Sequence, residues 1–145
     1  MKFEESICCA HVFATERRSA HKKADLTMVL NGALAGLVSI TAEPLTPSLG
    51  VATLIGGVGG LIVVFAVPML DKLKIDDVVG AIPVHLIAGI WGTLAVPLTN
   101  GDASFGTQIT SIVIVGASTF VVSWAVSTTI NMVTGIRALA EVELE

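Results

Sequence analysis

Four long stretches of the chain carry no charged side chain, and short polar segments separate them. The uncharged stretches cover residues 26–42, 51–70, 78–98 and 105–136. A helix needs roughly 20 apolar residues to cross the hydrocarbon core of a bilayer, within a range of about 17 to 25. The pattern predicts an all-α membrane protein with four transmembrane helices, over about residues 26–42, 50–70, 78–98 and 108–133.

The segments between the stretches have the composition of loops. They read EPLTPSLG at residues 43–50, DKLKIDD at 71–77 and TNGDASFG at 99–106, and they are rich in prolines, charges or turn-forming residues. A soluble protein with hydrophobic helices is the alternative interpretation. It would need a charged face at the helical period, and none of the four stretches has one.

Composition supports the membrane setting. Hydrophobic residues make up 53% of the 145 residues and charged residues only 14%, with a mean hydropathy of +0.84, whereas soluble domains carry about 25% charged residues. The chain also has 14 glycines. Two pairs, Gly32 with Gly36 and Gly56 with Gly60, have the small-xxx-small spacing that lets membrane helices pack closely.

The basic residues indicate how the helices are oriented. With four crossings, the N-terminal segment, the loop at 71–77 and the C-terminal tail lie on one side of the membrane. All eight basic residues fall on that side: Lys2, Arg17, Arg18, Lys22, Lys23, Lys72, Lys74 and Arg137. The positive-inside rule then predicts that both termini are cytoplasmic.

The first 21 residues differ from the rest of the chain, because they are polar, mixed in charge and without a period. They also lack the basic start and unbroken apolar run of a signal peptide. The only cysteines, Cys8 and Cys9, are expected to be reduced thiols in the cytosol. Palmitoylation of the cysteines, and metal binding by them with His11, remain open, but the spacing matches no zinc pattern. We expect no metal, no cofactor and no nucleic-acid partner.

His85 is the exception inside the third apolar stretch, about three residues from its middle. An α-helical spacing places Ala81, Ala88, Gly89 and Gly92 on the same face, so small residues flank the ring. A neutral imidazole has one donor and one acceptor nitrogen, and each needs a partner where water is absent. Two interpretations follow: a hydrogen bond to a neighbouring helix, or a position lining a path for a small solute or a proton.

Pro83 lies two residues before His85. Proline has no backbone N–H, so it leaves the carbonyl of Val79 without its helical partner. Within a membrane, such a carbonyl needs another donor from a neighbouring helix or a cavity.

Four segments resemble the C-terminal part of the ammonium transporter family (the Amt/Mep/Rh group). They are KADLTMVLNGALAGLVSITA, DKLKIDDVVGAIPVHLIAGIWGTLAV, SFGTQ and TGIRALAEVELE, in the family's order and spacing. The resemblance covers about residues 22–145, with a partial transporter domain at 22–138 and a short tail at 139–145. It does not include residues 1–21.

The resemblance implies a fold and a site. Members of the family have eleven transmembrane helices and form trimers with one narrow path in each protomer, and the helices here resemble the eighth to the eleventh. His85 matches the second histidine of the family's twin-histidine pair, which lines the path. Thr41 matches a threonine near the outer mouth of that path. The family's C-terminal tail contacts a PII-type signal protein, but the tail here stops early.

The same resemblance marks what the chain does not contain. The first histidine of the pair belongs to the family's fifth helix, which has no counterpart here, and His11 and His21 lie in the polar N-terminal part. We therefore expect a C-terminal fragment, either the product of a truncated or split gene or a gene model with an unrelated start. We expect it to be inactive alone in ammonium transport across the cell membrane. The alternative is a non-transporting membrane subunit that packs with a full-length relative. No enzyme is expected, because no nucleophile–base pair or phosphate loop is present.

The orientation can be tested by labelling single cysteines from outside intact cells. Cysteines introduced as Ser48→Cys or Asp102→Cys should react with an impermeant reagent, and one introduced as Lys74→Cys should not. External labelling at position 74 would contradict the four-helix arrangement.

Overall fold

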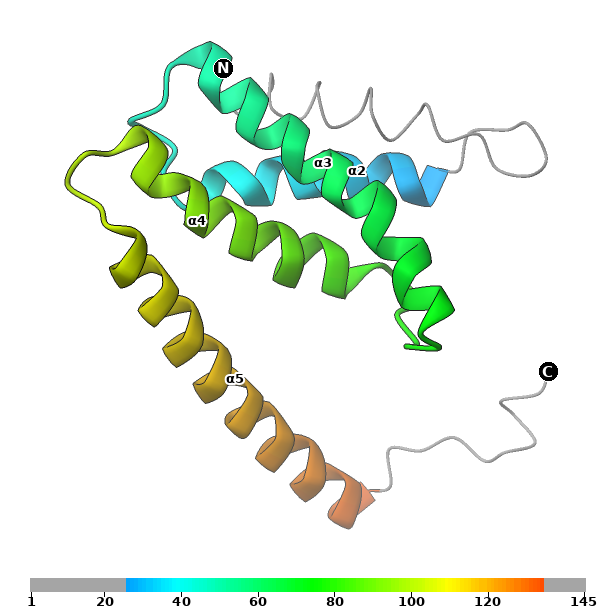
Figure 1. The fold of residues 1–145 in the computed structure, drawn as a ribbon. Helices are drawn as coiled ribbons and strands as arrows, with labels where there is room; N and C mark the ends of the chain where they lie inside the picture. The colour runs from blue at the N-terminus through cyan, green and yellow to red at the C-terminus, as the bar shows by residue number, and fades with distance from the viewer. Residues whose placement is uncertain (1–25, 135–145) are drawn as a thin grey trace. The chain divides into compact units, whose positions relative to one another are not determined.

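The computed structural model describes residues 26–134, and its regular structure is helical throughout. The elements in chain order are α2 (Leu26–Thr41), α3 (Leu49–Lys72), the π-helix η1 (Ile82–Ile87), α4 (Ala88–Thr99) and α5 (Phe105–Thr134) (Figure 1). Because η1 continues directly into α4, residues 26–134 contain four helices and no strand. The predicted all-α fold is confirmed.

Three of the helices are long and apolar enough to cross a membrane. Among the described residues these are Leu49–Lys72, Ile82–Thr99 and Phe105–Thr134, while Leu26–Thr41 is equally apolar but has 16 residues. Each of the four helices lies in one of the four uncharged stretches, apart from end residues. Length and hydropathy therefore support a membrane protein.

The third helix begins later than its apolar stretch. Val78 and Val79 form a turn, and Gly80 has a φ of +75°, which belongs to the left-handed region and ends any helical path through it. His85 is consequently the fourth residue of an 18-residue helix, Ile82–Thr99, and lies near its start. His85 is therefore farther from the middle of the helix than from the middle of the apolar stretch, because apolar character alone does not show where a helix begins.

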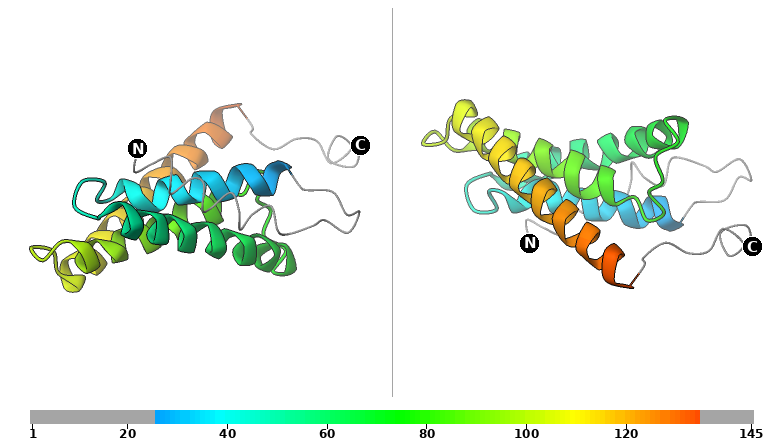
Figure 2. Two further views of the ribbon diagram at one scale, coloured as in Figure 1. Left: turned by 90° about the horizontal axis from the view of Figure 1, so that it is seen from above. Right: turned by 90° about the horizontal axis from the view of Figure 1, so that it is seen from below.

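The helices α2, α3 and η1–α4 pack together, and α2 contacts both of the others (Figures 1 and 2). The core has two clusters of buried side chains. One contains Ala35, Val63, Val84 and Ala88, and the other contains Ile40, Ala52, Ile55 and Ala95. The order of these contacts shows that α4 runs parallel to α2, whereas α3 runs antiparallel to it.

Ser39 of α2 marks a close approach of all three helices. A Cβ atom added at Gly59 of α3 would overlap the Ser39 hydroxyl, and one added at Gly92 of α4 would lie 2.5 Å from the Ser39 carbonyl oxygen. The hydroxyl donates to the Ala35 carbonyl at 2.7 Å and lies 3.5 Å from that of Ala88. Gly32, Gly36, Gly56 and Gly60 are also buried, so small residues allow the close packing that their spacing indicates.

Helix α5 belongs mostly to a second unit that begins at Ile109. None of its residues is buried within the described part of the chain. Several of its hydroxyl groups donate to carbonyls of the preceding turn, such as Thr128 to Trp124 at 2.7 Å and Thr129 to Ala125 at 2.8 Å. Its polar side chains are thus partly satisfied within the helix itself, as suits an apolar environment.

The close approach at Ser39 makes Gly92 sensitive to added volume. We expect Gly92→Ala to destabilise the folded chain by about 1–3 kcal/mol, because the new methyl group meets backbone atoms of α2 that cannot rotate away. The control is Gly116→Ala in α5, where an added Cβ meets nothing within 4 Å. Unfolding of the purified chain in detergent micelles measures both variants. Equal stability of the two would show that the helices do not meet closely at Gly92.

Candidate functional site

A cavity of about 410 Å³ lies where the start of α2 meets the start of η1. Its wall is mainly apolar and includes Leu30, Leu34 and Val84, with polar groups from Thr27, Asn31 and His85. The side chain of His85 is exposed within the described chain. This cavity is the candidate site, because it combines apolar walls with a few convergent polar groups.

Asp77 holds the start of the helix that carries His85. Its carboxylate accepts hydrogen bonds from the backbone N–H groups of Ala81 at 2.8 Å and Ile82 at 2.9 Å. These are groups at a helix N-terminus that have no partner within the helix. The Gly80 amide donates to the Asp77 carbonyl at 3.2 Å and closes the preceding turn.

The carbonyl of Val79 receives its hydrogen bond from another helix. The side-chain amide of Asn31 in α2 donates to it from Nδ2 at 3.1 Å. Asn31 is 7% exposed, and the bond itself is partly buried. The outside donor expected for this carbonyl is thus Asn31, although Val79 lies in the turn before the helix and not within it.

His85 lies within a π-helical turn. In η1 the hydrogen bonds span one residue more than in an α-helix, as between the Ala88 amide and the Pro83 carbonyl. Ala88 and Gly92 are buried near Ser39 of α2, whereas Ala81 and His85 are exposed and line the cavity beside the start of α2.

Thr41 lies apart from His85. It is the last residue of α2, it is exposed, and its hydroxyl donates to the Val38 carbonyl at 2.6 Å. Thr41 is seven residues beyond Leu34 of the cavity, which is about 10 Å along the helix at a rise of about 1.5 Å per residue. The structure does not bring the two sequence-predicted residues into one cavity.

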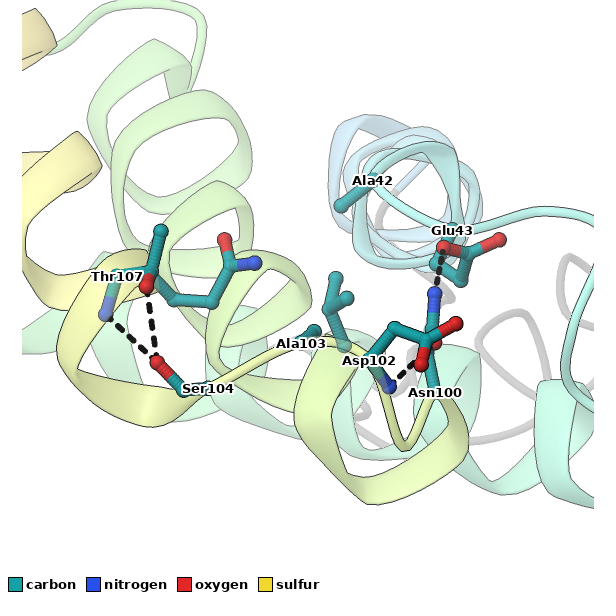
Figure 3. Close-up of a pocket in the computed structure, with 9 residues that line it drawn as sticks. Ala42, Glu43, Asn100, Asp102, Ala103, Ser104 and Thr107 are labelled. Atoms are coloured by element: carbon teal, nitrogen blue, oxygen red, sulfur yellow. Dashed lines mark hydrogen bonds between the residues drawn. The ribbon is translucent and has the colours of Figure 1, made fainter.

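A second cavity of about 370 Å³ lies at the other ends of α2 and α4 (Figure 3). The Asn100 side-chain amide donates to Glu43 at 3.1 Å, and the Asn100 side-chain carbonyl accepts from the Asp102 backbone N–H at 3.0 Å. Ser104 then caps the start of α5 by accepting from the Thr107 backbone N–H at 3.2 Å. These bonds link the loop after α2 with the loop before α5.

The charge state of Glu43 depends on these bonds. Hydrogen bonds from the Thr46 and Asn100 side chains stabilise the carboxylate and hold the pKa of Glu43 below its ordinary value of 4.5. Glu43 is therefore ionised at neutral pH and remains so somewhat below pH 4.5.

Comparison with known proteins shows the family. A profile of the Ammonium Transporter Family matches residues 6–145. The chain belongs to this family. The match also covers most of residues 1–21, the segment that we expected not to resemble the family.

Relatives within the ammonium transporter family are longer than this chain. It is 38% identical over 88 residues to an ammonium transporter of Archaeoglobus fulgidus, covering 61% of this chain and 19% of the relative. It is 32% identical over 125 residues to a putative ammonium transporter of Synechocystis sp., covering 79% of this chain and 23% of the relative. A second putative ammonium transporter of Synechocystis sp. is 42% identical over 90 residues, covering 61% of this chain and 20% of the relative. The chain thus matches about a fifth of the length of these relatives.

Sequence reasoning missed two residues that support the His85 segment. Asn31 is an amide within an otherwise apolar stretch, and intramembrane amides commonly bond to neighbouring helices. Asp77 stands at the end of a charged loop, four residues before the first helical N–H that it caps. Both signals are visible in the sequence, but neither shows which backbone group is the partner.

The depressed pKa of Glu43 leads to a pH-dependent stability. A carboxylate whose folded pKa is lowered contributes stability that is fully present above its unfolded value, near 4.5, and is lost as pH falls through the folded value. We expect Glu43→Gln to be less stable than the parent at pH 7 by a small amount, since the group is only partly buried and solvent screens its charge. The difference should disappear in acid.

Unfolding in detergent at pH 7 and at acid pH measures this effect. Asp102→Asn is the control, because it removes a carboxylate from the neighbouring loop without changing a side-chain partner of Asn100. The same deficit for Glu43→Gln at both pH values would show that charge on Glu43 does not stabilise the loops.

Proposed function

We propose that this chain takes part in the transport of ammonium or ammonia across the cell membrane, with His85 lining the path. The observation that carries the proposal is the exposed imidazole of His85 in a mainly apolar cavity of about 410 Å³. Family membership and three helices able to cross a membrane support it.

The chemistry of the cavity suits this substrate. Removing water from an ammonium ion in an apolar cavity is very costly, whereas neutral ammonia loses far less on entering it. An imidazole can accept a hydrogen bond from the solute at one nitrogen and donate at the other, so it can also relay a proton. Size alone does not separate ammonium from potassium, but hydrogen bonding and deprotonation do.

The resemblance to the family supplies the rest of the path as a proposal. His85 corresponds to the second histidine of the twin pair, and its partner ring comes from helices beyond the four described here. Thr41 lies nearer the outer mouth of the path. The proposed assembly is a homotrimer in the plasma or inner membrane with both termini in the cytoplasm. The proposed contact with a PII-type signal protein concerns residues 139–145, which lie outside the described part of the chain.

A second candidate function is that of a non-transporting subunit packed against a full-length relative. The observation that favours it is α5, whose 30 residues are largely apolar and include none that is buried within the described chain. Such a surface suits contact with further helices. Ammonium uptake by cells that express this chain with and without a full-length relative distinguishes the two functions.

The proposed function is tested with a chimaera in which residues 22–145 replace the matching part of a full-length relative. We expect His85→Leu to keep the bulk of the side chain but remove both nitrogens, which leaves the partner ring unpaired at a cost of about 1–3 kcal/mol. Ammonium flux should fall by about tenfold or more, or discrimination against potassium should fail. His85→Glu can still exchange a proton but attracts cations, so it should admit potassium.

Ammonium-driven current and potassium leak in reconstituted vesicles give both quantities. Thr93→Val is the control, because the Thr93 hydroxyl bonds to the Gly89 carbonyl of its own helix at 2.9 Å and lies outside the cavity. The unmodified chain alone, in cells without other family members, should give no uptake. Parent-level flux and selectivity in His85→Leu would show that His85 is only a packing residue.

A further inference from the structure

The π-helical turn that carries His85 packs against α2 and α3 through its buried residues. Among them, Val84 is 1% exposed and belongs to the core cluster with Ala35 and Val63. Val79, which precedes the turn, accepts the hydrogen bond from Asn31. This bond adds a contact with α2 at the point where the backbone approaches the turn.

We propose that Asn31 of α2 is a positioning residue for His85, which acts through its hydrogen bond to the Val79 carbonyl. This bond fixes where the backbone enters the π-helical turn and therefore the direction in which the His85 ring enters the cavity. Asn31 and His85 line the same cavity, but the hydrogen bond that the structure gives Asn31 within residues 26–134 is to Val79 and not to the ring.

The local backbone fits this role. Val79 lies in the turn before η1, and Pro83 has no N–H to donate to its carbonyl, so the Asn31 amide supplies the hydrogen bond. Gly80, with its φ of +75°, lies against the same amide, and a Cβ atom there would overlap Asn31 Nδ2. Proline at position 83 thus leaves the Val79 carbonyl free to accept from Asn31, and glycine at position 80 provides the space for the Asn31 amide.

The Asp77 cap is independent of Asn31. It holds the N–H groups of Ala81 and Ile82, which lie after the Val79 carbonyl in the chain. Loss of the Asn31 bond should therefore leave the helix in place while freeing the turn to change direction. The importance of a correctly oriented His85 ring for transport rests on the proposed function. The orienting hydrogen bond itself can be tested in this chain whether or not it transports ammonium.

The test compares Asn31→Leu and Asn31→Ala in the full chain, reconstituted in lipid nanodiscs. Both variants remove the Nδ2 donor of Asn31. Leucine fills the space of the asparagine side chain, whereas alanine leaves that space empty. An effect that both variants share therefore reports the lost hydrogen bond and not a change in volume. Thr93→Val is the control, since it removes a hydroxyl bond within α4 and leaves Asn31 intact.

Two measurements are made on each protein. In chain labelled with ¹⁵N-histidine, the imidazole resonances of His85 should shift or split in both Asn31 variants and stay at the parent position in Thr93→Val. Backbone amides of residues 84–88 should exchange about tenfold faster in both Asn31 variants, as expected for a lost hydrogen bond, while protection in α3 and in the later part of α4 is unchanged.

Two outcomes would overturn the proposal. In the first, both Asn31 variants keep the His85 resonances and the exchange of residues 84–88 at parent values. In the second, protection falls equally across α2, α3 and α4, which would show that Asn31 supports general stability only. Neither outcome bears on transport, so each is distinct from a failure of the proposed function.

Discussion

The structure depends on one constraint, that a polar backbone group in an apolar environment must find its partner within the protein. Within residues 26–134, no buried side-chain nitrogen or oxygen lacks a hydrogen-bond partner. Asn31 serves the Val79 carbonyl, and Trp91 donates from its indole nitrogen to the Ile55 carbonyl at 3.0 Å. The few polar side chains on these apolar helices therefore serve the backbone, and their positions determine how the helices are joined.

This hydrogen bonding is possible only because small residues bring the helices close. Gly59 and Gly92 let α3 and α4 approach Ser39, and Gly80 lets the start of the third helix approach Asn31. A donor on one helix can reach a carbonyl on the next only at such distances. Packing and hydrogen bonding are thus coupled, since a larger residue at the contact would also separate donor from acceptor.

The sequence predicts the four helices well, because the charged residues fall between the apolar stretches. It also predicts that Val79 needs an outside donor, because the effect of Pro83 is local. It does not identify Asn31 as that donor, since the pairing depends on how α2 lies against the third helix. The π-helical turn is missed for the same reason: the residues of Ile82–Ile87 are ordinary helix formers apart from Pro83, and no period marks the extra residue.

The π-helical turn also affects how this helix is compared with other sequences. A π-turn amounts to one residue inserted into an α-helix, after which every later side chain is rotated relative to the earlier ones. A helical wheel drawn through the whole of Ile82–Thr99 therefore mixes two registers. A relative with one residue fewer in this segment could restore a single register, and the same histidine would then point to a different neighbour without any change in residue type.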